Sequence, residues 1–345
     1  MTQPAPVDWE LATRIARRFA PSGPELKLAE ARDVVRDLRH HAVTAAEHVR
    51  SVTGLDAGPG HPAVVVDRGA WIDSNVGSLS SLVANWSTAM ERHEQAPSVL
   101  QALGPRVTAA QLGTALGWLS GKVLGQYEAL TDPGRLLLVA PTIVDVETSL
   151  QVDPRDFRLW VCLHEETHRV QFGAVSWLTE HFRSLVQRAL DTFDETDVSD
   201  RLAIVTREII GGIRAGEAPD LMAALQTDEQ RAVVDEITGL MSLLEGHADV
   251  VMDEVGPRVI PSVDSIRSKF NARRSRVRGA DSLWRRLLGM DAKLKQYEEG
   301  ARFVRYLLDH GGMESVNRVW ISPAYLPSAA EIRSPEAWLE RVEAA

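Results

Sequence analysis

Two histidines four residues apart are the part of this sequence that most clearly predicts chemistry. His164 and His168 form, together with Glu165, the pattern H-E-x-x-H. On a helix, side chains four residues apart lie on one face, so both imidazoles could hold one tetrahedral metal ion. Glu165 could then take a proton from a water molecule on that metal without binding the metal itself. A surface helix with two solvated histidines is the alternative interpretation.

A catalytic zinc ion needs a third protein ligand and an open position for water. Glu245 lies in an apolar stretch, where an unpaired carboxylate is costly and metal binding would remove that cost. Asp249, one helical turn later, could hydrogen-bond the far nitrogen of a histidine ligand. His247 competes for the third position, but it points about 200° around the helix from Glu245, so both cannot easily bind one ion. The presence of Asp249 favours Glu245.

Three further side chains are candidates for contact with a substrate or an oxyanion. His247 could stabilise an oxyanion, or it could be a hydrogen-bonded helix residue. Tyr127 and Tyr297 are each flanked by Gln and Glu, and a tyrosine hydroxyl can donate to an oxyanion. A partly buried structural tyrosine is the alternative for both.

The run from Arg267 to Arg278 carries six positive charges in twelve residues. It could bind phosphate or an acidic partner, or it could be a solvated helix face. The chain has no P-loop, no G-x-G-x-x-G and no G-x-S-x-G, so nucleotide binding and serine-hydrolase chemistry lack support.

The elements that must position these residues are mostly helices. Hydrophobic periodicity and breaker residues predict helices near 25–52, 76–92, 107–128, 142–151, 154–172, 174–190, 228–254 and 280–309, with a short one at Trp338-Leu339. Leu136–Val139 is the best strand candidate, and a Gly/Pro loop covers 55–62. We expect a mainly α fold with a small β element (α+β). A helical N-terminal region (1–105) would precede a catalytic region (106–345) with metal helices near 154–172 and 228–254.

Glycines recur every four residues at Gly113, Gly117, Gly121 and Gly125. This spacing could mark a membrane dimerisation face, or close helix packing in a soluble core. Polar residues interrupt the run and favour core packing.

Composition bounds the class of protein. The chain has 345 residues, a mass of 38.0 kDa, 44% hydrophobic and 25% charged residues, which fits one large globular domain or two ordinary ones. A net charge of −10 argues against a general nucleic-acid binder. A single cysteine, Cys162, excludes an internal disulfide framework and a cysteine-rich zinc site. With neither a signal-peptide pattern nor a membrane-spanning run, we expect a cytoplasmic protein.

Longer motifs resemble the actinobacterial zincin-like metallopeptidase family, whose members are often labelled as associated with biosynthesis of the deazaflavin coenzyme. The resemblance covers most of the chain, through Val7-Asp8-Trp9, Val66–Trp71 with Asn75, Gly117–Tyr127, Phe157–Trp160, His164–His168 with Phe172, Glu245–Ala248, Lys295–Tyr297 with Gly300, and Asn317–Pro323. It implies a mainly helical fold with a minimal sheet and no known substrate. Thr142 departs from the pattern, where Asn would be expected. The E-x-x-x-D spacing of Glu245 and Asp249 also resembles the second zinc helix of the gluzincins.

By analogy with zincins, the strand before the metal helix could be an edge strand that pairs with extended substrate. Val139-Ala140-Pro141 would then sit near the cleft. An ordinary core strand is the alternative.

Together these features predict a zinc-dependent hydrolase, in the first instance a metallopeptidase that cleaves an amide bond with one Zn²⁺ per chain. The alternatives are a zinc amidohydrolase of a small metabolite and a non-catalytic module with structural zinc, its fourth position filled for example by His247. Glu165 favours the enzymes, because a structural site does not need it. We expect a peptide or small amide substrate and neither nucleic acid nor membrane as partner, while the oligomeric state is not predicted.

Overall fold

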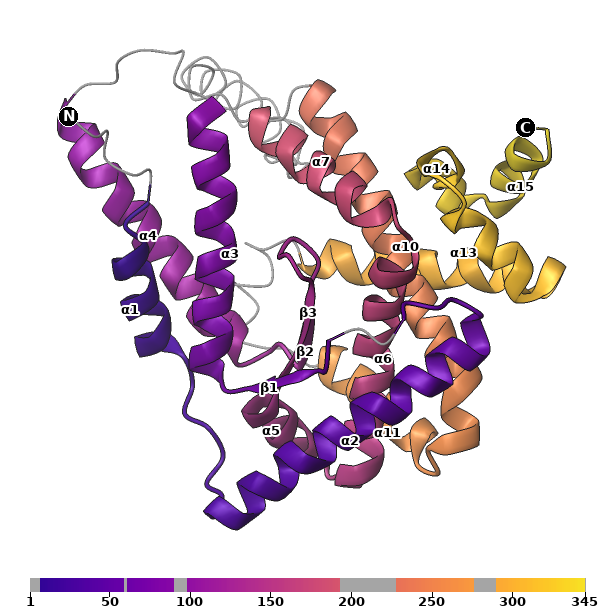
Figure 1. Cartoon of the computed structure of the whole chain (residues 1–345), viewed down its shortest axis with the longest axis horizontal. Coiled ribbons are helices and arrows are strands. Elements are labelled where there is room, and N and C mark those ends of the chain that lie inside the picture. Colours follow the sequence, from indigo (N-terminus) through magenta and orange to yellow (C-terminus); the bar gives the residue numbers. More distant parts are fainter. Residues whose placement is uncertain (1–6, 59–60, 90–97, 193–227, 276–289, 345) are drawn as a thin grey trace, which may run out of the picture. The chain divides into compact units, whose positions relative to one another are not determined.

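The computed structural model describes residues 7–58, 61–89, 98–192, 228–275 and 290–344 (Figure 1). The chain divides into two compact units, residues 1–176 with 247–293 and residues 177–246 with 294–345. The division passes through one continuous helix, α10 (Asp228–Val259). The boundary expected after residue 105 lies inside another helix, α4 (Ser98–Ser120).

A three-stranded sheet lies at the centre of the first unit. Its order is β1 (Val64–Val66), β3 (Arg135–Val139), β2 (Gly125–Glu128), with β1 parallel and β2 antiparallel to β3. Leu138 packs into one hydrophobic cluster, and Leu137 and Val139 pack into another on the opposite face. Because helices cover both faces of β3, its sequence is a continuous apolar run rather than an alternating one.

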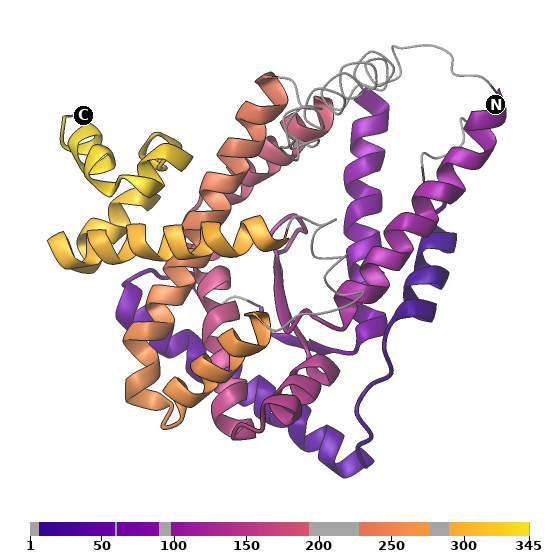
Figure 2. The same cartoon turned by 180° about the vertical axis from the view of Figure 1, so that it is seen from behind.

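The helices of the first unit form layers on the two sides of this sheet. One layer holds α1 (Trp9–Phe19), α3 (Arg68–Ala89) and α4, and the other holds α2 (Leu28–Thr53), α5 (Ala140–Leu150) and α6 (Pro154–Ala174). Figures 1 and 2 show α3 and α6 on opposite sides of β3. The later half of α10 and α11 (Val263–Ser275) contribute Met252, Val255 and Ile266 to the α6 side. Helix α6 therefore packs on a well-filled hydrophobic core.

The spaced glycines let α1 approach α4 closely. A Cβ at Gly113 or Gly117 would lie 2.6 Å from the carbonyl oxygen of Ala12 or Ala16 on α1. The packing interpretation of this spacing is thus confirmed for the helical part of the run. Within the described residues, no helix combines the length and apolar character that crossing a membrane requires.

The second unit is helical in its described part. It contains α7 (Leu178–Asp191), the first half of α10, most of α13 (Met290–Asn317), α14 (Ala329–Arg333) and α15 (Pro335–Glu343), with short 3-10 helices at Arg318–Trp320 and Pro323–Tyr325. Trp338 is fully buried against Phe303, and its indole nitrogen donates to the carbonyl of Tyr325 at 2.8 Å. The predicted helical segment at Trp338 is confirmed as part of α15.

The predicted mainly α fold with a small β element is confirmed. The helix expected over 107–128 is wrong at its end, because α4 stops at Ser120 and residues 125–128 form β2. Pairing with β3 supplies the backbone hydrogen bonds that a longer helix would have made. The strand at 136–139 is central in the sheet, so the hypothesis of an edge strand that pairs with substrate is wrong, and the alternative of a core strand is confirmed. Residues 280–289 of the last long predicted helix lie outside the described residues.

Candidate metal centre

Helix α6 places the two histidines of the H-E-x-x-H pattern on one face. The helix begins after Asp153, whose carboxylate accepts from the backbone nitrogens of Arg155 and Asp156 at 2.9 and 3.0 Å. The Nε2 atoms of His164 and His168 lie 3.2 Å apart, and both side chains are half-buried. Two nitrogens about 2.1 Å from one tetrahedral zinc ion would be roughly 3.4 Å apart, so this spacing suits a shared ion.

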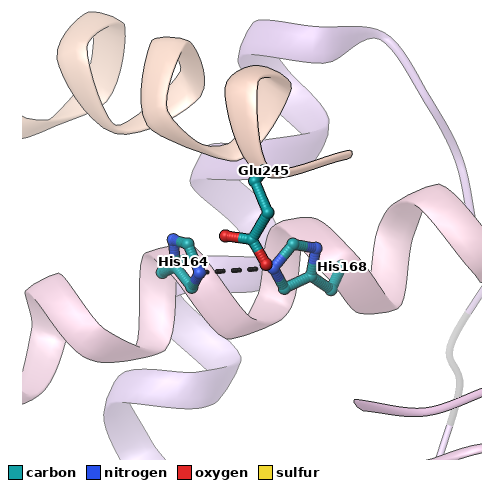
Figure 3. Close-up of side chains that lie close together, drawn as sticks. All are labelled: His164, His168 and Glu245. Carbon is teal, nitrogen blue, oxygen red and sulfur yellow. Dashed lines mark hydrogen bonds between the residues drawn. The ribbon is translucent and has the colours of Figure 1, made fainter. Parts of the chain in front are cut away.

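The third donor is Glu245 on α10. One ligand atom each of His164, His168 and Glu245 lie within 4.8 Å of one another, and Figure 3 shows the carboxylate directed at the two imidazoles. Glu245 stands one helical turn before Ala248 and Asp249, on the same continuous helix that packs beside α6 through Val251 and Met252. The regular geometry of α10 therefore sets where Glu245 can reach.

This donor set fits zinc. Two imidazole nitrogens and one carboxylate are hard-to-borderline ligands of the kind that zinc takes in catalytic sites, and three protein ligands leave one position open. His247 is not a member of this group, so the geometry favours Glu245 over His247 as the third ligand. Of the residues that the structure describes, these three form the one group of this kind.

Glu165 is buried beside the histidines and lies against the edge strand β2. A Cβ at Gly125 would come within 2.6 Å of Cγ and Cδ of Glu165, so only glycine fits there without displacing the carboxylate. The sequence motif predicted Glu165, but the role of Gly125 in its packing was not predicted. The strand edge that approaches the motif is thus β2 and not β3.

The family model of zincin-like metallopeptidases matches residues 7–339 of this chain. The chain belongs to the zincin-like metallopeptidase family. Its sequence is 30% identical to that of a Chloroflexus aurantiacus protein whose crystal structure is provisionally described as that of a hydrolase with a novel fold. The two structures superpose with a TM-score of 0.69, over 98% of this chain and 99% of that one. No curated protein matches the sequence.

This zincin-like chain has a buried amide beside one of the candidate metal ligands, and the sequence did not predict it. Gln171 is fully buried, and its Oε1 lies 2.9 Å from Nδ1 of His168 while its Nε2 lies 2.9 Å from Nδ1 of His247. Its place on α6, three residues after His168, is the signal that could have found it. His247 is also fully buried, and burial, with a smaller effect of His168, lowers its pKa to about 3. His247 is therefore neutral across the ordinary pH range.

Asp249 occupies a different place from the expected one. Its side chain is exposed, and one carboxylate oxygen lies 3.9 Å from Arg267 on α11. The Nδ1 atom of His168 instead contacts Gln171. The contact predicted between Asp249 and the far nitrogen of a histidine ligand is therefore made, at His168, by Gln171 instead.

The structure describes the side chain of Tyr127 but not that of Tyr297. Tyr127 on β2 stacks on Phe172 with ring centroids 5.6 Å apart, and a side chain at Gly134 would overlap its hydroxyl. Burial raises the pKa of Tyr127. Its contacts are thus those of a packed tyrosine beside α6. Tyr297 lies on α13, and its side chain is outside the described residues.

Thr142 and the described part of the basic run both have hydrogen-bond or ion-pair partners within the chain. Thr142 is buried in α5, where its hydroxyl donates to the carbonyl of Ser120 at 2.9 Å and accepts from Arg68 at 3.1 Å. In the basic run, Arg267 pairs with Asp253, and Lys269 donates to the carbonyl of Gln151 at 2.8 Å. Residues 276–278 of that run are outside the described residues.

Proposed function

We propose that this chain is a zinc-dependent hydrolase that cleaves an amide bond, with peptides as its substrates. The observation that carries the proposal is the convergence of His164, His168 and Glu245 next to the buried carboxylate of Glu165. Membership of the zincin-like family supports zinc as the metal. The description of the Chloroflexus aurantiacus protein as a hydrolase supports the reaction class.

Different residues of the chain would bind the metal and transfer the proton in such a reaction. His164, His168 and Glu245 would hold the ion and leave a position open toward solvent. A bound zinc ion supplies Lewis-acid chemistry, which lowers the pKa of a water ligand and polarises a carbonyl. Glu165 would accept a proton from the attacking water and return it to the departing amine, so that no net proton is consumed. The backbone of Gly125 would keep the Glu165 carboxylate in place.

The proposal extends to substrate and location. The resemblance to proteins labelled with deazaflavin biosynthesis makes a small amide metabolite the second candidate substrate, handled by the same residues. A cytoplasmic location agrees with a sole cysteine, Cys162, that is free and buried. The buried Glu165 argues for catalysis over a structural zinc module, since a structural site has no use for a general base.

Metal content is the first test. Elemental mass spectrometry of the purified wild type should find about one zinc ion per chain, and His168→Ala and Glu245→Ala should each lose it, because two remaining ligands hold zinc weakly. His40→Ala and Glu254→Ala are matched controls on exposed or half-exposed sites of α2 and α10, and both should keep the metal. A wild type that takes up no zinc would overturn the proposal, and zinc retained by Glu245→Ala would remove Glu245 from the ligand set.

The substrate class needs a separate measurement. The zinc-loaded wild type should hydrolyse members of a peptide library, with new amino termini detected by mass spectrometry. If the library stays intact while a deletion strain accumulates an amide metabolite, the small-molecule candidate replaces the peptide one.

A further inference from the structure

Gln171 joins the two histidines that flank the metal centre. All three residues belong to the same compact unit, since Gln171 and His168 lie on α6 and His247 begins that unit's part of α10. The two contacts of the amide are both 2.9 Å long, and both reach the Nδ1 atom of an imidazole. A fully buried amide with one histidine at each end is a specific arrangement, because its oxygen can only accept and its nitrogen can only donate.

Metal binding fixes the direction of this chain of hydrogen bonds. The Nε2 atom of His168 faces that of His164 at 3.2 Å, so Nε2 is the nitrogen that would bind the ion. A neutral imidazole that binds a metal through Nε2 carries its proton on Nδ1, and that proton needs an acceptor. The Oε1 atom of Gln171 is in place to accept it.

The hydrogen-bonding role of the other end of the amide is then fixed. With Oε1 turned to His168, the Nε2 amide group of Gln171 faces Nδ1 of His247 and must donate to it. A neutral His247 that accepts at Nδ1 carries its proton on Nε2. One amide therefore sets the tautomers of both histidines.

We propose that Gln171 is a positioning residue of the metal centre, which holds His168 as a metal ligand and His247 as an Nε2–H hydrogen-bond donor. The proposal rests on the zinc site proposed above. It gives the buried His247 a defined tautomer, with the proton on Nε2, and it gives a role to the buried amide that follows the H-E-x-x-H pattern.

Two variants of Gln171 separate its two hydrogen bonds. Gln171→Met keeps the volume but removes both bonds, so the zinc affinity should fall by about 10- to 100-fold, the usual effect of losing a hydrogen-bond partner of a metal-binding histidine. Gln171→Glu keeps an acceptor for His168 but offers no donor to His247. Its zinc affinity should stay close to that of the wild type, while the proton of His247 moves from Nε2 to Nδ1.

Zinc affinity is measured by competition with a chromophoric chelator, and the tautomers by long-range ¹H–¹⁵N NMR spectra of the histidine rings. The signals of His247 are assigned from their loss in His247→Gln. Gln230→Met is the matched control, because Gln230 is another buried glutamine, on α10, whose amide donates to the carbonyl of Thr192. The control should bind zinc as the wild type does.

The outcomes distinguish this inference from the proposed function. Unchanged zinc affinity in Gln171→Met, or a wild-type His247 protonated on Nδ1, would overturn the role of Gln171 alone. A wild type that binds no zinc would overturn the metal centre and this inference together. Should Gln171→Met fail to fold, as judged by circular dichroism, the wild-type tautomer and the Gln171→Glu variant decide the matter.

Discussion

Turnover should depend on the carboxylate of Glu165, whereas zinc binding should not. Glu165→Gln keeps the size and the burial of the side chain but cannot accept a proton, so kcat should fall by about 10²- to 10⁴-fold. Zinc content should stay at the wild-type level, because Glu165 is not one of the three ligands. Elemental mass spectrometry beside a peptide-hydrolysis assay checks both halves, and wild-type turnover in this variant would exclude Glu165 as the base.

Gly125 should be as sensitive to substitution as Glu165, the proposed general base that it faces. A methyl group in Gly125→Ala would come 2.6 Å from Cγ and Cδ of Glu165, so the carboxylate must move, and we expect a loss of activity of about 10²-fold or more with zinc retained. Gly77→Ala is the matched control, since nothing lies within 4 Å of a Cβ added there on α3. Equal activities of the two variants would contradict the packing of Glu165 on β2.

His41 provides a residue whose protonation should affect stability. Burial, and less strongly His40, lowers its pKa, against a smaller opposite effect of Asp37. The unfolded chain therefore takes up this proton near pH 6.5 while the folded chain does not, so the free energy of unfolding falls as the pH drops below about 6.5. In His41→Gln, urea denaturation of the zinc-free protein should show a smaller loss of stability between pH 7 and 5. An unchanged pH dependence would mean that His41 is exposed or charged in the folded protein.

At the scale of whole elements, α10 and α13 approach each other so closely that two glycines are required. A Cβ at Gly300 on α13 would overlap the carbonyl oxygen of Ser242, and one at Gly246 would overlap the backbone of Gly300. Gly300→Ala should therefore force the helices apart and lower the free energy of unfolding by about 1–3 kcal/mol or more. Because Gly246 directly follows Glu245, the same variant should also weaken zinc binding. Thermal unfolding and chelator competition measure the two effects, and a stable variant with normal affinity would contradict this packing.

The elements that could be predicted from the sequence are those whose pattern is local. Helix α6 carries its own cap at Asp153, its apolar spacing and its motif, and the run from Leu136 to Val139 marks β3. Strand β2 could not be predicted, since four residues beginning with Gly125 become a strand only by pairing with β3. The choice between Glu245 and His247, and the contact of Gln171 with both α6 and α10, depend likewise on how two distant helices pack.

For the molecule as a whole, the proposed zinc ion should act as a stabilising ligand. The ion would bind His164 and His168 on α6 and Glu245 on α10, two helices that are far apart in the sequence. A ligand that binds only the folded state raises the stability of the protein by mass action. At zinc concentrations 100-fold above Kd the gain is about 2.7 kcal/mol, which should raise Tm by several degrees, and a chelator should reverse it. Glu245→Ala should show almost no zinc-dependent shift in differential scanning calorimetry, whereas Glu254→Ala on the same helix should shift as the wild type does. Equal shifts in all three proteins would mean that the ion binds elsewhere, and the site at His164, His168 and Glu245 would then have to be given up.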